Sequence, residues 1–112
     1  MPQTIAVSAL SVAANAQSTD QLSGTLLERA PSTGVVTIAA KASVTGLNMT
    51  FIVGETTVVN DTVIPFTGTA GTLSLIDNVF VQTGVVAFSK MILRFRNTTG
   101  GAITVDAIVQ FQ

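Results

Sequence analysis

The groups in this chain of 112 residues that could do chemistry are six carboxylates and five basic side chains. The acids are Asp20, Glu28, Glu55, Asp61, Asp77 and Asp106. Histidine and cysteine, the usual proton shuttle and thiolate nucleophile near neutral pH, are both absent. A glycosidase needs two carboxylates that converge across a cleft, and these acids are isolated in the sequence. Tryptophan and tyrosine, whose rings commonly stack on sugars, are absent too. The sequence therefore predicts a protein that is not an enzyme.

Two pairs of neighbouring Asn and Asp residues near loop ends are candidate calcium ligands, because calcium binds oxygen atoms. They are Asn60-Asp61 and Asp77-Asn78. Neither lies in the DxDxDG spacing of a calcium loop, and Asn and Asp favour turns because they bond their own backbone. Without Cys and His, a zinc site of ordinary type is excluded. The prediction is that the chain binds no metal and no cofactor.

Lys90, Arg94 and Arg96 form the one basic cluster, on one face of a predicted strand. They could make a docking stripe for an acidic partner or a phosphate backbone. Alternatively they pair across strands, with Asp106 neutralising Arg94. No aromatic side chain is interleaved on that face, and the net charge is −1, so a protein partner is favoured over nucleic acid.

The dominant pattern has period two, which places alternate side chains on opposite faces of a strand. The apolar runs are 5–12, 35–44, 47–53, 56–64, 79–86, 90–96 and 103–111. In the first run the alternation slips by one residue at Ala9-Leu10, which predicts a bulge or bend. Asn60-Asp61 divides the fourth run and predicts a turn. The small-residue segment 66–72 is a predicted loop.

The runs predict an all-β fold: a single β-sandwich, jelly-roll-like, with about 7–8 short antiparallel strands. One domain spans 1–112, with residues 1–18 forming an extended arm or the first strand. Residues 19–30 are compatible with a capped helix stopped by Pro31, or with strand and loop, and Gly24 weakens the helix.

The sequence has few features that indicate a cellular compartment. No segment has the ~20 apolar residues of a membrane span, and no Lys or Arg precedes Asp20 to form the n-region of a signal peptide. Three Asn-x-Thr sequons, at Asn48, Asn60 and Asn97, would carry glycans only in a secretory compartment. We expect neither membrane contact nor glycosylation.

The last two runs predict a hairpin in which Phe95 faces Val105 and Arg94 faces Asp106. In this register Ile92 and Ile108 lie together on the outer face. An outward apolar patch marks an interface, so we expect a subunit contact there. The predicted interface residues are Ile92, Ile108, Lys90, Arg94 and Arg96.

The segment 94–105, RFRNTTGGAITV, resembles the Thr/Gly-rich β-hairpins of small virion proteins in tailed bacteriophages. The whole chain, without Cys and biased to Thr, Ala, Val and Gly, resembles their capsid decoration (cement) proteins. The resemblance implies β-rich homo-oligomeric knobs, commonly trimers. They are made in the host cytoplasm and bind the virion surface between major capsid protein subunits, where they stabilise the shell.

Two other functions fit the same composition. One is a small coat subunit that forms the shell itself, although a coat around nucleic acid usually has a basic arm and residues 1–28 hold no Lys or Arg. The other is a carbohydrate-binding jelly-roll adhesin, against which the absence of Trp and Tyr counts.

Overall fold

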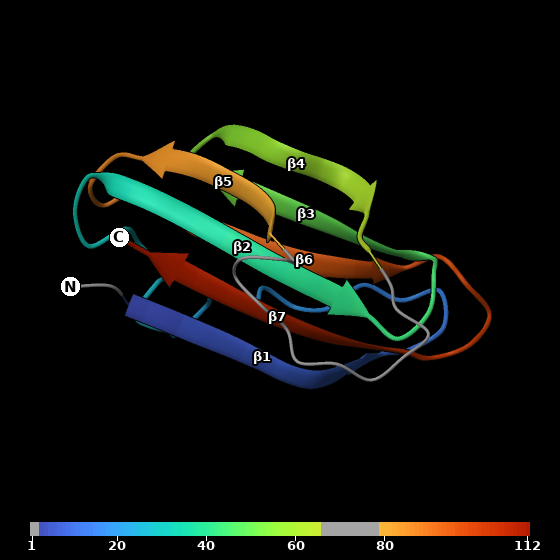
Figure 1. The fold of residues 1–112 in the computed structure, drawn as a ribbon. Helices are drawn as coiled ribbons and strands as arrows, with labels where there is room; N and C mark the ends of the chain where they lie inside the picture. The colour runs from blue at the N-terminus through green and yellow to red at the C-terminus, as the bar shows by residue number, and fades with distance from the viewer. Residues whose placement is uncertain (1–2, 66–78) are drawn as a thin grey trace.

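The computed structural model describes residues 3–65 and 79–112, and the regular elements in these two ranges are β-strands (Figure 1). They are β1 (Gln3–Val12), β2 (Gly34–Ala42), β3 (Leu47–Val53), β4 (Thr56–Val63), β5 (Val79–Val85), β6 (Met91–Asn97) and β7 (Ile103–Phe111). All paired strands run antiparallel. The prediction of an antiparallel all-β chain is confirmed. The predicted loop 66–72 lies outside the described residues.

The strands form two sheets packed face to face, with orders β1-β7-β2-β5 and β4-β3-β6 (Figure 1). This is the β-sandwich that the alternation predicts. β3 and β4 follow each other in the sequence and pair within one sheet. The chain crosses to the other sheet between β2 and β3, and it crosses again at each connection from β4 to β5, β5 to β6 and β6 to β7. A jelly roll places eight strands in two sheets. The described residues hold seven strands, and an irregular segment lies along the edge of β6.

The alternation correctly predicts which side chains fill the core. Met91, Leu93 and Phe95 of β6 are fully buried, while the residues between them are half-buried or exposed. The same holds for β7, where Ile103, Val105, Ala107, Val109 and Phe111 face inward. Apolar burial of this kind stabilises by roughly 25 cal/mol per Å², and it supplies the main packing between the sheets.

The predicted β6–β7 hairpin is wrong. β6 pairs with β3, and β7 pairs with β1 and β2 in the opposite sheet. The turn at 98–102 therefore joins the two layers instead of two neighbours in one layer. Alternation fixes which face of a strand is buried, but it does not fix the pairing partner. Phe95 and Val105 share the core from opposite sheets.

β1 contains the bulge that the sequence predicts. Its register with β7 shifts between Val7 and Leu10, and Ala9 has a φ of 50°. The Ala9 amide donates to Oδ1 of Asp106 at 2.7 Å. The Asp106 carboxylate accepts a hydrogen bond from an amide that has no partner in the strand ladder. Asp106 therefore stabilises the bulge and does not pair with Arg94.

Residues 19–30 form turns, so the helix considered for this segment is not formed. The segment 16–30 instead follows the open edge of β6. Ser18 and Gln21 donate backbone hydrogen bonds to the carbonyls of Phe95 and Leu93, at 2.7 and 2.8 Å. The segment also contributes buried side chains to the core, those of Leu22, Leu27 and Ala30. A helix would satisfy its own backbone and leave the β6 edge unpaired.

Two side chains of this segment act as acceptors for β6 amides. Ser18 Oγ accepts from the Phe95 amide at 2.9 Å. Asp20 Oδ1 accepts from the amides of Leu93 and Leu22, both at 3.0 Å. The edge of β6 is therefore closed by side-chain oxygens as well as by backbone carbonyls.

The predicted turn at Asn60-Asp61 is instead an irregularity within β4. Asp61 has a φ of 47°, and the register of β4 against β3 shifts on either side of Phe51. The strand continues through it to Val63. Asn and Asp tolerate this left-handed backbone better than other non-glycine residues, which explains why the same dipeptide suits a bulge.

Asn97 ends β6 and is the buried polar side chain of the described core, at 1% exposure. Its Nδ2 donates to the carbonyls of Val12 and Gly101 at 2.9 and 2.7 Å. Its Oδ1 accepts from the amide and hydroxyl of Thr99, both at 2.8 Å. The amide thereby ties β1 to the β6–β7 turn, and the burial leaves no space for a glycan at this sequon.

Replacing Asn97 with alanine should lower the free energy of unfolding by about 3 kcal/mol, because the carbonyls of Val12 and Gly101 and the amide of Thr99 lose their partner. Asn48→Ala is the matched control, since Asn48 is half-buried and donates one bond, to the Asp61 carbonyl; it should cost about 1 kcal/mol. Urea denaturation measures both. Equal losses in the two variants would contradict the role given to Asn97.

Asp20→Ala should lower the free energy of unfolding by roughly 1–3 kcal/mol, because two amides lose one acceptor. Hydrogen exchange at the Leu93 amide should accelerate in the folded state. Glu28→Ala is the control, since the contact of Glu28 with β6 runs through its backbone carbonyl to the Met91 amide. If Leu93 stays as protected as in the wild type, Asp20 does not close the edge.

Candidate functional site

The structure separates the predicted interface residues. Ile92, Arg94 and Arg96 share the outer face of β6, and Lys90 immediately precedes that strand. Ile108 lies on β7 in the other sheet, where its cross-strand neighbours are Ala6 and Ala39. The joint patch of Ile92 and Ile108 therefore does not form. That patch depended on the β6–β7 pairing, which the sandwich replaces.

Ile92 has a different apolar neighbour, Ile52 of β3, which lies directly opposite. Both side chains are half-buried. Arg94 lies opposite Thr50 on the same face. This outer face is thus mixed in character, with one apolar pair beside hydroxyl and guanidinium groups.

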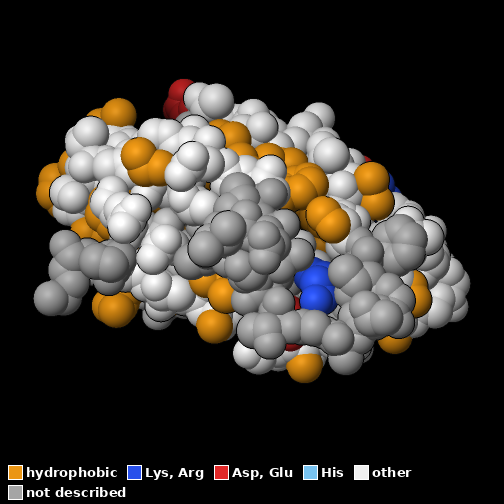
Figure 2. Space-filling view, in the orientation of Figure 1, with side chains coloured by type: hydrophobic (Ala, Val, Ile, Leu, Met, Phe, Trp, Pro, Cys, Tyr) orange, Lys and Arg blue, Asp and Glu red, His pale blue; other side chains and the backbone are white. Residues whose placement is uncertain are grey.

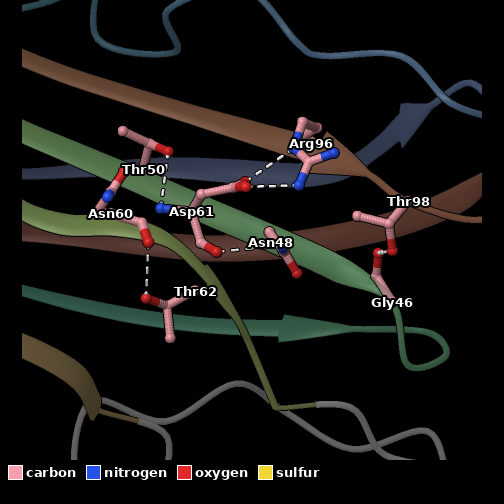
Figure 3. Close-up of polar contacts among 8 residues, drawn as sticks. All are labelled: Gly46, Asn48, Thr50, Asn60, Asp61, Thr62, Arg96 and Thr98. Carbon is pink, nitrogen blue, oxygen red and sulfur yellow. Dashed lines mark hydrogen bonds and ion pairs between the residues drawn. The ribbon is translucent and has the colours of Figure 1, made fainter.

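Arg96 is held by Asp61 in a bidentate ion pair (Figure 3). Nε and Nη2 of Arg96 donate to Oδ1 and Oδ2 of Asp61 at 2.9 and 2.5 Å. The backbone of Asp61 is fixed in turn, because its amide donates to Thr50 Oγ1 and its carbonyl accepts from Asn48 Nδ2, both at 3.2 Å. The left-handed residue of β4 is thereby fastened to β3 and β6.

The pair shifts the acidity of both groups. The hydrogen bond from Arg96 lowers the pKa of Asp61 below its ordinary value near 3.8, and the Asp61 carboxylate raises the pKa of Arg96. The carboxylate oxygens that were candidates for calcium are occupied by a guanidinium. Arg96 is likewise committed within the chain, so it is not a free docking cation.

The other two basic residues have different surroundings. Lys90 forms an isolated bridge with Arg29, which places two cations side by side. Arg94 lies across the sandwich from Asp106, so the predicted pairing between these two is wrong. Asp106 has Lys41 as its cross-strand neighbour. The predicted basic cluster therefore consists of Arg96, which is paired with Asp61, together with Arg94 and Lys90.

The described acids do not converge on a reaction centre. Within residues 3–65 and 79–112, no three Asp or Glu side chains gather as a metal site. Asp20, Asp61 and Asp106 each bond a backbone amide or a guanidinium. The second calcium candidate, Asp77-Asn78, lies outside the described residues. In the same part of the chain no helix is long and apolar enough to cross a membrane.

One end of the sandwich carries a feature that the sequence patterns missed. Phe88, in the β5–β6 connection 86–90, is 72% exposed and has a φ of 67°. Its amide donates to the Ala30 carbonyl at 2.8 Å, and its carbonyl accepts from Arg29 Nη1 at 3.2 Å. An exposed aromatic residue in a costly left-handed backbone is a mark of functional loops. In the sequence, the one sign of Phe88 was its position: it lies between two alternating runs and continues the alternation of neither.

A hollow of about 300 Å³ lies beside this connection. It is lined by Val53, Thr56, Val58, Thr83, Gly84, Val85, Val86 and Ser89. These residues come from β3, β4, β5 and the connection to β6, so the hollow lies between the two sheets. A second hollow, of about 400 Å³, is lined by Thr45, Val63, Ile64, Pro65 and Phe80. It borders the point where the described chain stops, and we assign it no site.

Apolar side chains are exposed over the whole of the face shown in Figure 2. The large exposed ones are Leu26, Val35, Val44, Val63, Val86 and Phe88. Neutral polar groups lie among them, and few charged groups are in view (Figure 2). Contacts made by this surface must rest on apolar and backbone groups more than on charge.

Comparisons with known proteins identify no family. No protein-family model matches the chain, and no curated protein matches it in sequence. Among solved structures, the chain is similar to the C-terminal CBM6 of LamC, a marine laminarinase from Zobellia galactanivorans. The identity is 15%, the match covers 98% of this chain and 100% of that chain, and the TM-score is 0.47. This likeness carries no conclusion on function.

The Arg96–Asp61 pair generates a prediction for acid stability. Because the pKa of Asp61 is lowered in the folded state, its contribution is present above the unfolded pKa and is lost as the pH falls through the folded value. Asp61→Asn should therefore reduce the loss of stability between neutral pH and the region below about pH 4. Urea midpoints across this range measure it.

Arg96→Gln is the matched variant, since it removes the other partner and should flatten the same part of the pH profile. Added salt should weaken the effect in the wild type, because both side chains are partly exposed. A wild-type profile that keeps its full acid dependence in both variants would contradict the pairing.

Proposed function

We propose that this chain is a non-catalytic structural subunit that decorates and stabilises a phage capsid by binding between shell subunits. The observation that carries the proposal is the edge strand β1. It has ten residues, Gln3–Val12, pairs on one side with β7, and contains no charged residue and no proline. Natural sheets protect such edges with charges or prolines. The bulge at Ala9 shortens the regular edge, and among the described residues no second strand pairs with its first half.

The surface supports the same proposal. Four valines, Leu26 and Phe88 are exposed, and the chain carries few charges to keep it apart from other subunits. Contacts through strand addition and apolar side chains are weak singly, and they add by avidity when a shell repeats the partner many times. The major capsid protein is the proposed partner, and a homotrimer on the virion surface is the proposed form.

The described acids support a non-catalytic role because three of them are engaged in structural bonds. The remaining described acids, Glu28 and Glu55, lie in the loop segment beside β6 and at the β3–β4 turn. A coat subunit that encloses nucleic acid is less well supported, because no Lys or Arg occurs in residues 1–28.

Native mass and capsid binding test the proposal together. Light scattering should give a species larger than the 11.5 kDa chain, and the protein should co-sediment with purified empty phage capsids. Ala6→Lys should reduce co-sedimentation, because a lysine on the open edge opposes strand addition. Thr104→Lys, on the outer face of the internal strand β7, is the control and should bind as the wild type does.

A protein that stays at the mass of one chain at high concentration and does not sediment with capsids would refute the proposal. Equal loss of binding in both lysine variants would refute the role of β1 alone, since it would point to general charge effects.

A further inference from the structure

Two cations lie directly opposite each other where the segment 16–30 meets the start of β6. They are Arg29 and Lys90, which form an isolated antiparallel bridge. The amides of Ala30 and Met91 each donate a backbone hydrogen bond of 2.9 Å to the opposite chain, one on either side of the bridge. Arg29 and Lys90 are therefore a non-hydrogen-bonded pair, in which the side chains share one face with Cβ atoms about 4.5–5.5 Å apart.

No acid neutralises this cation pair within the described residues. Arg29 Nη1 donates to the Phe88 carbonyl at 3.2 Å, which orients the guanidinium but leaves its charge uncompensated. Lys90 forms no side-chain hydrogen bond or ion pair in the described chain, and both cations are exposed. Toward β3 its neighbour is Gly54, whose amide donates to the Lys90 carbonyl at 2.8 Å. Like charges directly opposite each other on a sheet are destabilising, so an anionic group bound here would remove that cost.

The outer face of β6 continues from this pair. Ile92 lies opposite Ile52 of β3, and both are half-buried. Arg94 follows opposite Thr50, and its side chain forms no hydrogen bond or ion pair within the described chain. Lys90 and Arg94 are about 14 Å apart along the strand, at a rise of ~3.4 Å per residue. The order along β6 is thus a cation pair, an apolar pair and a cation. The β6 strip, as we name it, consists of Arg29, Lys90, Ile52, Ile92 and Arg94.

We propose that the β6 strip binds an extended acidic segment of a partner protein, with two carboxylates four residues apart and an apolar side chain midway between them. An extended segment has the same rise per residue as β6, so its alternate side chains reach the cation pair, the isoleucines and Arg94 in turn. Guanidinium and ammonium groups form charge-assisted hydrogen bonds with carboxylates. The strip ends at Arg96, which Asp61 already pairs. This inference rests on the proposed function for the identity of the partner, since on a capsid the segment belongs to the major capsid protein.

Other occupants fit the strip less well. A single small anion such as phosphate would use the cation pair and leave the isoleucines and Arg94 without a partner. A single strand of nucleic acid binds by stacking its bases on aromatic side chains as well as by charge. The outer positions of β3 and β6 hold no aromatic residue. An apolar segment would cover the isoleucines and leave three cations uncompensated.

The test uses the isolated full-length chain and a capped synthetic peptide, Thr-Ser-Asp-Thr-Leu-Thr-Asp-Ser-Thr. Amide NMR spectra recorded during titration at low salt should show saturable shifts at 90–94 and at Arg29, while the amides of β1 stay unchanged. Added salt should weaken binding, because it screens exposed charges. A peptide of the same composition with adjacent aspartates should bind about threefold more weakly, because one of its carboxylates lacks a partner.

Arg94→Gln and Lys90→Gln should each weaken the peptide about threefold, a typical value for one exposed charge pair. Lys41→Gln is the matched control, because it removes the same charge from β2 in the other sheet, and should bind as the wild type does. Ile92→Thr should abolish the preference for this peptide over a version with serine in place of leucine. Spectra of the free variants establish that each is folded.

Three results would overturn the proposal. One is the absence of shifts at 90–94, or shifts centred on another surface. Another is equal binding of the peptide and its rearranged control. The third is tighter binding of inorganic phosphate or of a thymidine oligonucleotide than of the peptide.

Capsid sedimentation separates this inference from the proposed function. Capsid binding by the wild type without peptide binding would refute the strip alone. Peptide binding without capsid binding would refute the proposed function and support the strip.

Discussion

The structure depends on closing the free edge of β6. β6 lies at the border of the three-stranded sheet, and its amides would face water or another chain if nothing bonded them. The segment 16–30 supplies acceptors for the amides of four β6 residues: the backbone carbonyls of Ala16 and Glu28 and the side-chain oxygens of Ser18 and Asp20. Because the same segment buries Leu22 and Leu27, closing the edge also completes the core.

Three of the described acids bond the chain where its regular strand pairing fails. Asp20 serves the edge of β6, Asp106 the bulge of β1, and Asp61 ties the irregular part of β4 to Arg96. Each acid lies where regular pairing fails. A chain with so little charge gains specificity by placing it at these points, while apolar burial provides the bulk of the stability. The outer surface in view is left mostly neutral (Figure 2).

The sequence predicted the strands and their inner faces because alternation states directly which side chains are buried. It also predicted the bulge at Ala9, where the alternation slips. It did not predict the partner of each strand, because β6 and β7 bury the same residues whether they pair or face each other. The interface expected at Ile92 and Ile108 failed for that reason. The sequence also did not predict that residues 19–30 cover the edge of β6, because an irregular backbone leaves no periodic pattern in the sequence.

The hollow beside the β5–β6 connection was the least predictable part. Val53, Thr56, Thr83 and Ser89 come from three separate regions of the sequence and meet only after the two sheets pack. Phe88 belongs to no alternating run, and its left-handed backbone follows from contacts with Ala30 and Arg29 that are almost sixty residues away in sequence. Features built between layers in this way are products of topology, which single-strand patterns do not contain.

The pairing of β1 with β7 places Gln3 opposite Phe111, and Gln112 exchanges backbone bonds with Val35. Both chain ends therefore emerge at the end of the sandwich that carries Phe88 (Figure 1). Any purification tag or fluorescent fusion attached to either chain end will crowd that end of the sandwich. An epitope or label inserted into the turn at 98–102, on the opposite pole, would leave it clear. The two ends of the sandwich therefore differ: one carries both chain ends and Phe88, and the other is free of them.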